Sequence, residues 1–344
     1  MPEHVCVTIV TYNSRRYIGR CLEAVLDQKG VRLDVIVVDN SSTDGTRQIL
    51  KNFSKGCRVF LNRRNEGFAA AQNQAIAAGR GDWVLTLNPD VLLEPDFAQR
   101  LIEAALPDPV IGSVCGKLLS IGPGFQQLAE RLIDSTGIYF TPAMRHFDRG
   151  WHEPDTGQYE TRDFVFGASA AAALYRREMI EDIAQGHDFF DPDFFAYRED
   201  ADVAWRAQLL GWRCLYTPDA IGYHVRTVTP ENRRSLPAVL NMHSVKNRFL
   251  MRIKNCTPGL YRRYWLPMTA RDAVVVGGCL LREPSSLPAF WHLARSLGRA
   301  LDRRRLIMTR RRVDDDALNR WMRERETPQV LPAIEACAPS ERIA

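Results

Sequence analysis

The stretch Val37-Val-Asp-Asn-Ser-Ser-Thr-Asp-Gly45 decides the fold, because in it an apolar run gives way abruptly to a polar cluster. The apolar part completes a buried-strand run over Leu33–Val38, and Ser42 or Thr43 could cap the helix that follows. A buried strand, a polar turn and then a helix form the repeating unit of parallel α/β sheets. The sequence therefore predicts such a sheet here.

The same alternation continues on both sides of this stretch. Strands are expected over Val5–Val10, Leu33–Val38, Val59–Leu61 and Trp83–Leu87, and helices over Arg15–Gln28, up to Leu50, and over Phe68–Ala78. This order predicts a doubly wound, mostly parallel sheet, on which ligands bind beyond the carboxyl ends of the strands. Three polar clusters follow such ends: Thr11–Asn13, Asp39–Ser42 and Asn88–Asp90.

The middle of the chain is less regular. Residues 107–124 and 140–163 are expected to be rich in loops, because Gly, Pro and aromatic residues are interleaved there. A helix ending at Ile183 and another over 200–210 follow. A strand at Cys214–Tyr216 is expected to end in a turn at Pro218-Asp219.

Composition excludes wholesale disorder, because 45% of the 344 residues are hydrophobic and 25% are charged. Eight scattered cysteines without a C-x-x-C pair argue against a zinc or disulfide framework and favour a reducing compartment. No signal peptide is expected before the first strand. The longest apolar run of the last third, Ala273–Leu281, is too short to span a bilayer. A cytoplasmic location is expected.

Charge is distributed unevenly along the chain. Residues 226–325 hold 22 basic and 8 acidic residues, whereas residues 1–225 hold 23 and 30. The triplets Arg303-Arg-Arg305 and Arg310-Arg-Arg312, with Trp265 and Trp291 in the same region, favour a helical surface on an anionic membrane. A solvated helical face is the alternative. Nucleic acid is not expected as a partner, because no nucleic-acid motif accompanies the charge.

Taken together, the clusters resemble those of the family 2 glycosyltransferases. The matching pieces are Val10-Thr-Tyr-Asn13, Val37–Gly45, Asn65-Glu-Gly-Phe-Ala69 with Asn73, Leu87-Asn-Pro-Asp90, Phe166-Gly-Ala168, Phe190–Phe195, Tyr197–Asp202 with Trp205-Arg206, and Pro218-Asp-Ala220 with His224. The resemblance covers about residues 5–225 and looks most like a bacterial rhamnosyltransferase branch. It implies a nucleotide-sugar-binding GT-A domain over 1–225, followed by a basic, mainly helical appendage over 226–344.

The resemblance also implies a donor site at the strand ends. The Asp39 carboxylate would accept the imide N–H of a uracil or thymine, although capping the next helix is an alternative role. The other substrate-binding candidates are Thr11, Tyr12, Asn13, Asn40, Gly67, Asn73, Asn88, Gly167 and Ala168. The glycines would let the backbone approach a ligand closely. Arg63 and Arg64 could offset diphosphate charge or form an ordinary surface pair.

The motif Asn88-Pro89-Asp90 departs from the family's Asp-x-Asp by its first residue. A Mg²⁺ or Mn²⁺ ion bound with a diphosphate needs few protein ligands, because phosphate oxygens and water complete the octahedron. The resemblance implies Asp90 as a ligand, with Asn88 at the ribose or a bound water. His224 is a second metal candidate or a structural histidine. A simple strand-ending turn is the alternative interpretation of the motif.

Three acidic residues open the helix expected over 200–210. Carboxylates are favoured at any helix N-terminus, which explains one of them more easily than three. By motif position Asp200 is the candidate base that takes the proton of the acceptor hydroxyl, with Glu199 second. Asp202 and Arg206 lie one turn apart and are expected to form a structural pair.

These expectations amount to an inverting, metal-dependent glycosyltransferase. The resemblance implies a dTDP- or UDP-sugar as donor, with dTDP-rhamnose preferred, and a lipid-linked or saccharide acceptor in bacterial cell-surface polysaccharide synthesis. One alternative is a catalytically silent GT-A-like scaffold in a membrane complex. A nucleotidyltransferase is disfavoured, because no Gly-rich triphosphate loop follows the first strand.

Overall fold

A computed structural model describes residues 2–226 and 237–322 of the chain. The strands are β1 (Glu3–Thr11), β2 (Val31–Asp39), β3 (Arg58–Leu61), β4 (Trp83–Leu87), β5 (Val91–Leu93), β6 (Ile111–Ser120), β7 (Ile133–Ser135), β8 (Ile138–Phe140), β9 (His146–Asp148), β10 (Asp163–Val165), β11 (Ala172–Arg176) and β12 (Arg213–His224). The helices are α1 (Ile18–Leu26), α2 (Thr46–Asn52), α3 (Phe68–Ala78), α4 (Phe97–Ala105), α5 (Arg177–Ile183), α6 (Glu199–Leu209), α7 (Ala238–Asn255), α8 (Pro258–Leu281), α9 (Pro288–Thr309) and α10 (Asp315–Asn319), with short 3-10 turns η1 (Pro192–Phe194) and η3 (Pro284–Ser286).

The strands form one large sheet in the order β10-β12-β6-β11-β4-β1-β2-β3, with β5 beside β12 and β7 beside β6. The first-half strands β1 to β4 pair in parallel, as predicted, whereas β11 runs antiparallel between β4 and β6. The predicted α/β class is confirmed. In the parallel register Thr11 lies opposite Asp39, so two of the predicted polar clusters meet at the same sheet edge.

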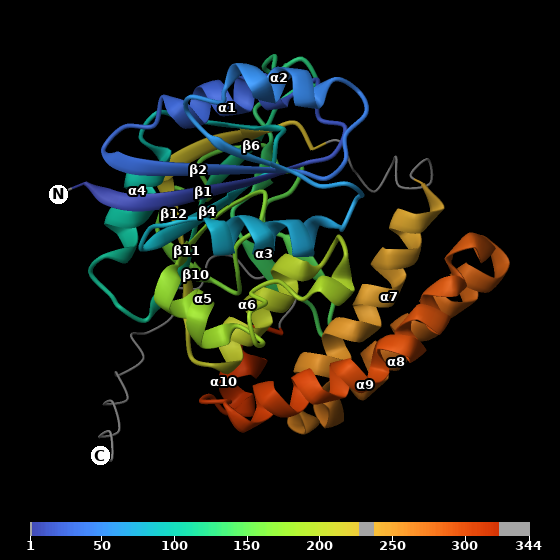
Figure 1. Cartoon of the computed structure of the whole chain (residues 1–344). Coiled ribbons are helices and arrows are strands. Elements are labelled where there is room, and N and C mark those ends of the chain that lie inside the picture. The colour runs from blue at the N-terminus through green and yellow to red at the C-terminus, as the bar shows by residue number, and fades with distance from the viewer. Residues whose placement is uncertain (1, 227–236, 323–344) are drawn as a thin grey trace.

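Alternating side chains give the sheet two apolar faces. Along β1, Val5, Val7 and Ile9 point into one core, while Cys6 and Val10 belong to the other. Helices α1 and α2 cover the first face, and α3, α5 and α6 lie on the opposite side (Figure 1). Every residue of β1 from Val5 to Thr11 is buried, as a strand covered on both faces requires.

The expectation of loops over residues 107–124 is wrong, because β6 runs through the sheet there. Its glycines are required by packing: a Cβ on Gly116 would lie 2.3 Å from the Ala220 carbonyl oxygen. The polar Lys117 is buried and pairs with Asp155 at 3.2 Å. The turn expected at Pro218-Asp219 is instead an irregularity within β12, whose register against β6 shifts between Tyr216 and Ile221.

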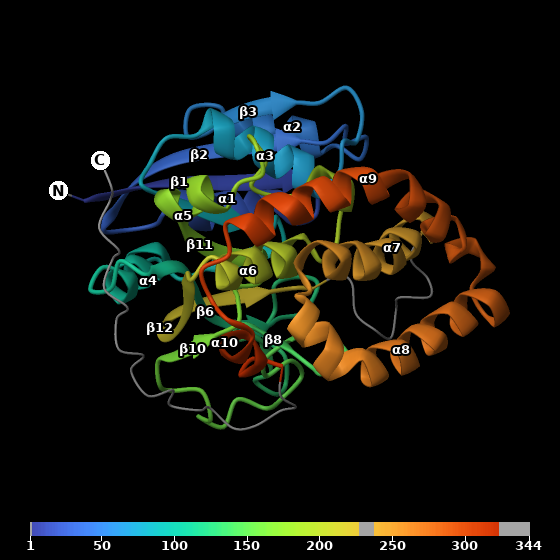
Figure 2. The ribbon, with the colours of Figure 1, turned by 90° about the horizontal axis from the view of Figure 1, so that it is seen from below.

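The C-terminal region is helical, as expected, and packs onto the front body. Helix α9 runs along α7 in Figures 1 and 2. Leu250 and Ile307 of this region share a hydrophobic core cluster with Phe190 and Trp205 of the front part. The division at residue 225 stays a prediction, while the core is common to both sides of it.

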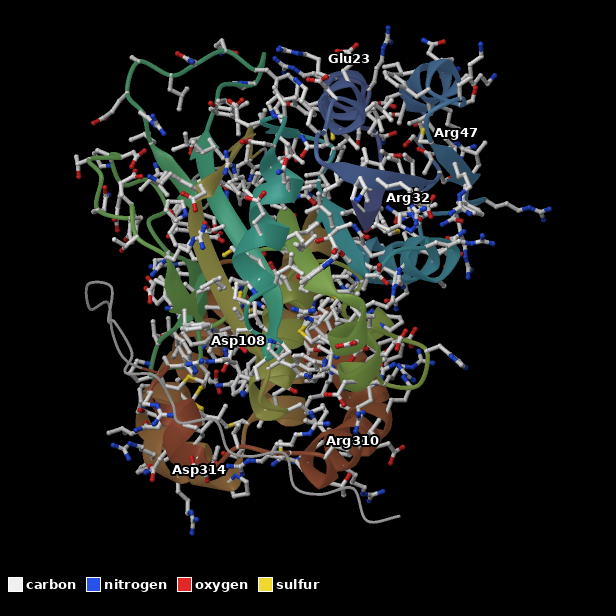
Figure 3. The ribbon with its side chains drawn as sticks, turned by 90° about the vertical axis from the view of Figure 1, so that its left-hand side faces the viewer. Glu23, Arg32, Arg47, Asp108, Arg310 and Asp314 are labelled. Carbon is white, nitrogen blue, oxygen red and sulfur yellow. The ribbon has the colours of Figure 1, made fainter. Side chains whose placement is uncertain are left out.

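The two arginine triplets do not form the outward basic face that their charge suggests. Five of the six arginines bond inward. Arg303 contacts Asp191 and Asp193, Arg304 donates to the carbonyls of Ile253 and Cys256, Arg310 and Arg312 donate to Asp182, and Arg311 donates to Asp315. Figure 3 shows Arg310 where the red C-terminal helices meet the body. Among the described residues, no helix has the length and apolarity to cross a membrane.

Candidate active site

The first polar cluster surrounds the buried carboxylate of Asp39. The Thr11 hydroxyl donates to its Oδ2 at 3.0 Å, and the Ser42 amide and the Arg47 guanidinium donate to its Oδ1 at 3.1 and 2.5 Å. The bond from Ser42 shows that Asp39 organises its own turn. Its fixed position at the strand end leaves Thr11 and Asp39 side by side at the floor of the predicted donor site.

The neighbouring loops are held by Asn13 and Asn40. Asn13 has a left-handed backbone, and its side-chain oxygen accepts from the Thr43 amide at 2.9 Å. The Asn40 amide donates to the Gly67 carbonyl at 2.9 Å. Tyr12 is 54% exposed beside them. The structure thus gathers the predicted residues 11–13, 39–40 and 67 at one edge, with Tyr12 as the open aromatic surface.

Three other substrate-binding candidates have structural tasks. The Asn73 amide group is taken up by Asp188 and by the backbone of Phe190. A Cβ on Gly167 would lie 2.2 Å from that of Ala204, so this glycine admits α6 rather than a ligand, and its neighbour Ala168 is buried. That these positions contact substrate stays a prediction, beside the packing and hydrogen-bonding roles that the structure gives them. Arg64 pairs with Glu66 on the surface, which was the alternative considered for it.

The metal candidates Asp90 and His224 are brought together from distant parts of the chain. The antiparallel pairing of β5 with β12 places Asp90 Oδ1 3.4 Å from His224 Nε2. The other ring nitrogen, Nδ1, lies 2.8 Å from Asp134 Oδ2. Burial disfavours a charged imidazole, but the carboxylates of Asp134 and Asp90 raise the pKa of His224 to about 10.

The residue types fit a divalent cation, which would have to replace the proton on His224 Nε2, because a histidine with a pKa of about 10 is protonated at pH 7. A metal-binding histidine commonly has its second ring nitrogen held by a carboxylate, as Asp134 holds His224. Burial alone would raise the pKa of Asp90, yet His224 holds it below its ordinary value, so the carboxylate is ionised. No group of three or more His, Cys, Asp or Glu ligands occurs in the described parts of the chain, so phosphate and water would complete the coordination. Asn88 lies at the same strand end, half-buried.

The acidic pair at the start of α6 is tuned by burial. Burial, helped by the neighbouring charge of Asp200, raises the pKa of Glu199 to about 8, and its buried Oε2 has no hydrogen-bond partner among the described residues. Burial and then the charge of Asp148 raise the pKa of Asp200 to about 6. The Ala170 amide donates to Asp200 Oδ2 at 3.4 Å. At neutral pH Asp200 is the ionised member of the pair.

A chain of charged groups connects the metal candidates with this pair. Arg226 donates to Asp134 Oδ1 and to Asp148 Oδ2, both at 2.6 Å, and it also acts electrostatically on Asp200. Asp134, Asp148 and Arg226 carry no motif of their own, and sequence reasoning missed them. They can be recognised only in the structure, where the fold brings their three segments together.

The backbone just before the acidic pair has an unusual conformation. Phe195, Tyr197 and Arg198 all have positive φ, between 64° and 71°, which is costly for residues other than glycine. Three carbonyls of this loop are held from α7. The buried Asn247 amide donates to the carbonyls of Phe194, Ala196 and Tyr197 at 2.8, 2.9 and 2.8 Å.

The same loop reaches the donor side of the site. The Phe195 carbonyl accepts from the Ala69 amide at 3.2 Å, and a Cβ on Gly67 would lie 2.6 Å from the Phe195 ring. Gly67 therefore makes room for this loop, which fixes the donor edge relative to Asp200. The expected pair of Asp202 and Arg206 is confirmed at 2.9 Å, and Lys254 of α7 joins it, also at 2.9 Å.

These features define the class. A mixed α/β sheet with a polar strand edge, an Asp90–His224 pair and a buried acidic helix start is the organisation of a GT-A glycosyltransferase. The family model for glycosyl transferase family 2 matches residues 6–184, and the chain belongs to that family.

Comparisons with individual proteins agree. An N-acetylglucosaminyl-diphospho-decaprenol L-rhamnosyltransferase of Mycobacterium tuberculosis is 27% identical over 246 residues, covering 65% of this chain and 76% of the relative. A poly-beta-1,6-N-acetyl-D-glucosamine synthase of Staphylococcus aureus is 24% identical over 221 residues, covering 64% and 49%. The first curated relatives matched are covered over 15 to 48% of their own length.

The fold is shared with solved structures. A Pyrobaculum calidifontis mannosyltransferase in complex with GDP-Man and Mn²⁺ superimposes with a TM-score of 0.51 at 18% identity, covering 90% of this chain and 86% of the other. At this identity the likeness shows the fold alone.

Proposed function

We propose that the protein is an inverting, metal-dependent sugar transferase acting in polysaccharide synthesis, with dTDP-rhamnose as donor and a lipid-linked saccharide as acceptor. The observation that carries the proposal is the pair of tuned carboxylates at the start of α6, linked through Asp148 and Arg226 to Asp90 and His224. Rhamnose and the lipid-linked acceptor are supported by the mycobacterial relative's name.

The roles follow from position and charge. Asp39 and Thr11 bind the base of the nucleotide, and Tyr12 offers a ring against it. Asp90 and His224 hold a divalent cation, which when bound neutralises charge on the departing diphosphate. Mn²⁺ in the solved mannosyltransferase supports this assignment.

Asp200 acts as the general base. Its carboxylate takes the proton of the acceptor hydroxyl while the oxygen attacks the anomeric carbon. The bond from that carbon to the diphosphate oxygen breaks on the opposite side, so the configuration inverts. A base with a pKa of about 6 is ionised at pH 7 yet still basic enough to be effective. Glu199, with a pKa of about 8, keeps its proton at pH 7, so it is an uncharged neighbour of the base.

A screen of nucleotide sugars tests the donor. Thermal shift is measured with dTDP-, UDP- and GDP-sugars, with and without Mn²⁺ or Mg²⁺, because a ligand bound by the folded state raises its melting temperature. We expect the largest shift for dTDP-rhamnose with metal. A larger shift with another sugar would replace the donor, and no metal-dependent shift with any of them would overturn the proposal.

Turnover and stereochemistry are tested with the donor so found. Product formation on a soluble acceptor analogue is followed across pH, and the anomeric configuration of the product is read by NMR. We expect activity to rise with pH through about 6 as Asp200 ionises. Retention of configuration would contradict the inverting mechanism. The silent-scaffold alternative predicts no turnover, and the intact, ordered Asp39, Asp90 and Asp200 speak against it.

The enzyme is further proposed to work at an anionic membrane surface, where a lipid-linked acceptor resides. Because the triplet arginines bond within the chain, the proposed contact is assigned to another surface.

A further inference from the structure

The outer side of α8 is unusual for a helix of a globular protein. Of its 24 residues only Leu260, Met268 and Cys279 are buried. Its exposed large apolar residues are Tyr261, Trp265, Leu266, Val274, Leu280 and Leu281. Leu281 is 85% exposed, close to the value of a free side chain. A helix this apolar on its solvent side is one that has a partner.

Part of this exposed surface forms one stripe, whereas Tyr261 and Trp265 point to other sides of the helix. Leu266, Ala270, Val274 and Leu281 follow a spacing of three to four residues or its multiples, which keeps them on one side of the helix. The stripe is about 24 Å long at 1.5 Å per residue. Trp291, 56% exposed in the first turns of α9, follows it directly across η3.

The exposed charges on the stripe are Arg262 and Arg263. Asp272 lies toward α7, where it accepts from Arg248 and Arg252. Arg282 and Glu283 follow the end of the helix, and Glu283, which accepts from the Ser286 hydroxyl, keeps its negative charge there. The face therefore combines apolar side chains with two arginines.

The combination of apolar side chains and arginines favours an anionic membrane over a second copy of the chain as the partner. In a symmetric dimer through this face, the arginines of one copy would lie near those of the other, which is unfavourable. An anionic bilayer surface accepts both features at once, because the apolar residues enter the interface and the arginines bind headgroups. Charged Arg271 and Asp272 in mid-helix fit a helix that lies on a bilayer rather than one that spans it.

We propose that this docking face (Leu266, Val274, Leu280 and Leu281, with Arg262 and Arg263) binds the surface of an anionic membrane. The inference deepens the membrane association in the proposed function and rests on it. The carboxyl ends of β1 and β2 and the turn between α8 and α9 are directed toward the same side in Figures 1 and 2, so one end of the docking face lies on the side of the predicted donor edge.

Flotation with lipid vesicles tests the docking face. The full chain is mixed with vesicles of equal parts phosphatidylglycerol and phosphatidylcholine, or of phosphatidylcholine alone. We expect binding to the anionic vesicles that weakens in about 0.5 M NaCl. The double variant Leu266→Gln/Leu281→Gln should bind at least about tenfold more weakly, because two large apolar side chains no longer enter the interface.

Matched control variants show whether the loss of vesicle binding is specific to the docking face or follows the removal of any exposed leucines. Leu106→Gln/Leu128→Gln changes two exposed leucines of the front body and should bind like the wild type. Arg262→Gln/Arg263→Gln should lose the preference for anionic vesicles. Absence of vesicle binding, or an equal loss in both leucine pairs, would overturn the proposal. A wild-type dimer that dissociates in Leu266→Gln/Leu281→Gln without any vesicle binding would assign the face to a second copy.

Turnover on a soluble acceptor analogue keeps this test apart from the proposed function. The α8 variants should retain it, since these residues are remote from Asp200 in the fold. Retained turnover with no vesicle binding refutes only the docking face. Vesicle binding without turnover of any nucleotide sugar refutes the transferase proposal.

Discussion

The front body and the C-terminal helices differ in how their charged residues are used. In the front body the predicted acidic residues stand at strand ends and at a helix start, where they face one edge of the sheet. In the helices, all six arginines of the two triplets bond to carboxylates or carbonyls of the chain itself. A strand end fixes where a side chain points, whereas a charge count does not. The helices thus act first as a support of the catalytic loop.

The largest effect is expected at Asp200. The variant Asp200→Asn should lower kcat about 10²–10⁴-fold, the usual contribution of a general base, while the donor Kd changes little. Rates on a soluble acceptor and donor binding by calorimetry check this. The matched variant Glu199→Gln should retain more activity. A fully active Asp200→Asn beside an inactive Glu199→Gln would move the base by one residue.

The metal candidates come next. Asp90→Ala should abolish metal-dependent donor binding, because no second carboxylate belongs to that motif. Titration of Mn²⁺ and donor by calorimetry reads this without turnover. An Asp90→Ala protein whose donor affinity still depends on Mn²⁺ as in the wild type would contradict the assignment.

A smaller effect should come from the helical region itself. Asn247→Leu leaves three carbonyls of the left-handed segment without their donor, and each unsatisfied buried group costs about 1–3 kcal/mol. Part of this should appear as a loss of kcat of about 10- to 100-fold, because the loop shifts Asp200. The control Asn319→Leu removes an amide far from the loop, at Tyr264, and should keep kcat. Equal kcat values for the two variants would contradict the claim that α7 positions the loop before Asp200.

Removing inward arginines should affect stability rather than docking. Arg310→Gln/Arg312→Gln leaves Asp182 without its two arginine partners and should lower the free energy of unfolding by up to about 1 kcal/mol per pair, because both arginines are partly exposed. Urea denaturation measures the loss, and flotation should show unchanged vesicle binding. A stable variant that no longer floats would return the membrane contact to these triplets.

The smallest effect is a gain. The folded state raises the pKa of Glu199 to about 8, so between pH 4.5 and 8 the folded protein holds a proton that the unfolded chain has released. Stability therefore falls as pH rises through this window. Glu199→Gln cannot ionise and should melt a few degrees higher at pH 8, with no difference near pH 4. Calorimetry at both pH values checks the sign, and a lower melting temperature at pH 8 would contradict it.

The sequence allows most of the parallel half of the fold to be predicted, because buried β-branched runs and polar turns are local signals. The prediction fails at β6, where Gly112, Gly116 and the buried Lys117 resemble loop residues. In the structure these residues are required by contacts with segments far along the chain. The site shows the same division. Thr11, Asp39, Asp90 and Asp200 follow from their motifs, whereas Asp134, Asp148 and Arg226 depend on pairings between distant segments.

The left-handed segment ahead of Asp200 also sets an order of events during synthesis. The strands of the parallel half precede it in the chain and can pair as soon as they leave the ribosome. Asn247, which holds its carbonyls, is made only later. The nascent protein therefore has the predicted donor edge before the loop that leads to the candidate base Asp200 is held in place, and that loop is fixed only when α7 docks.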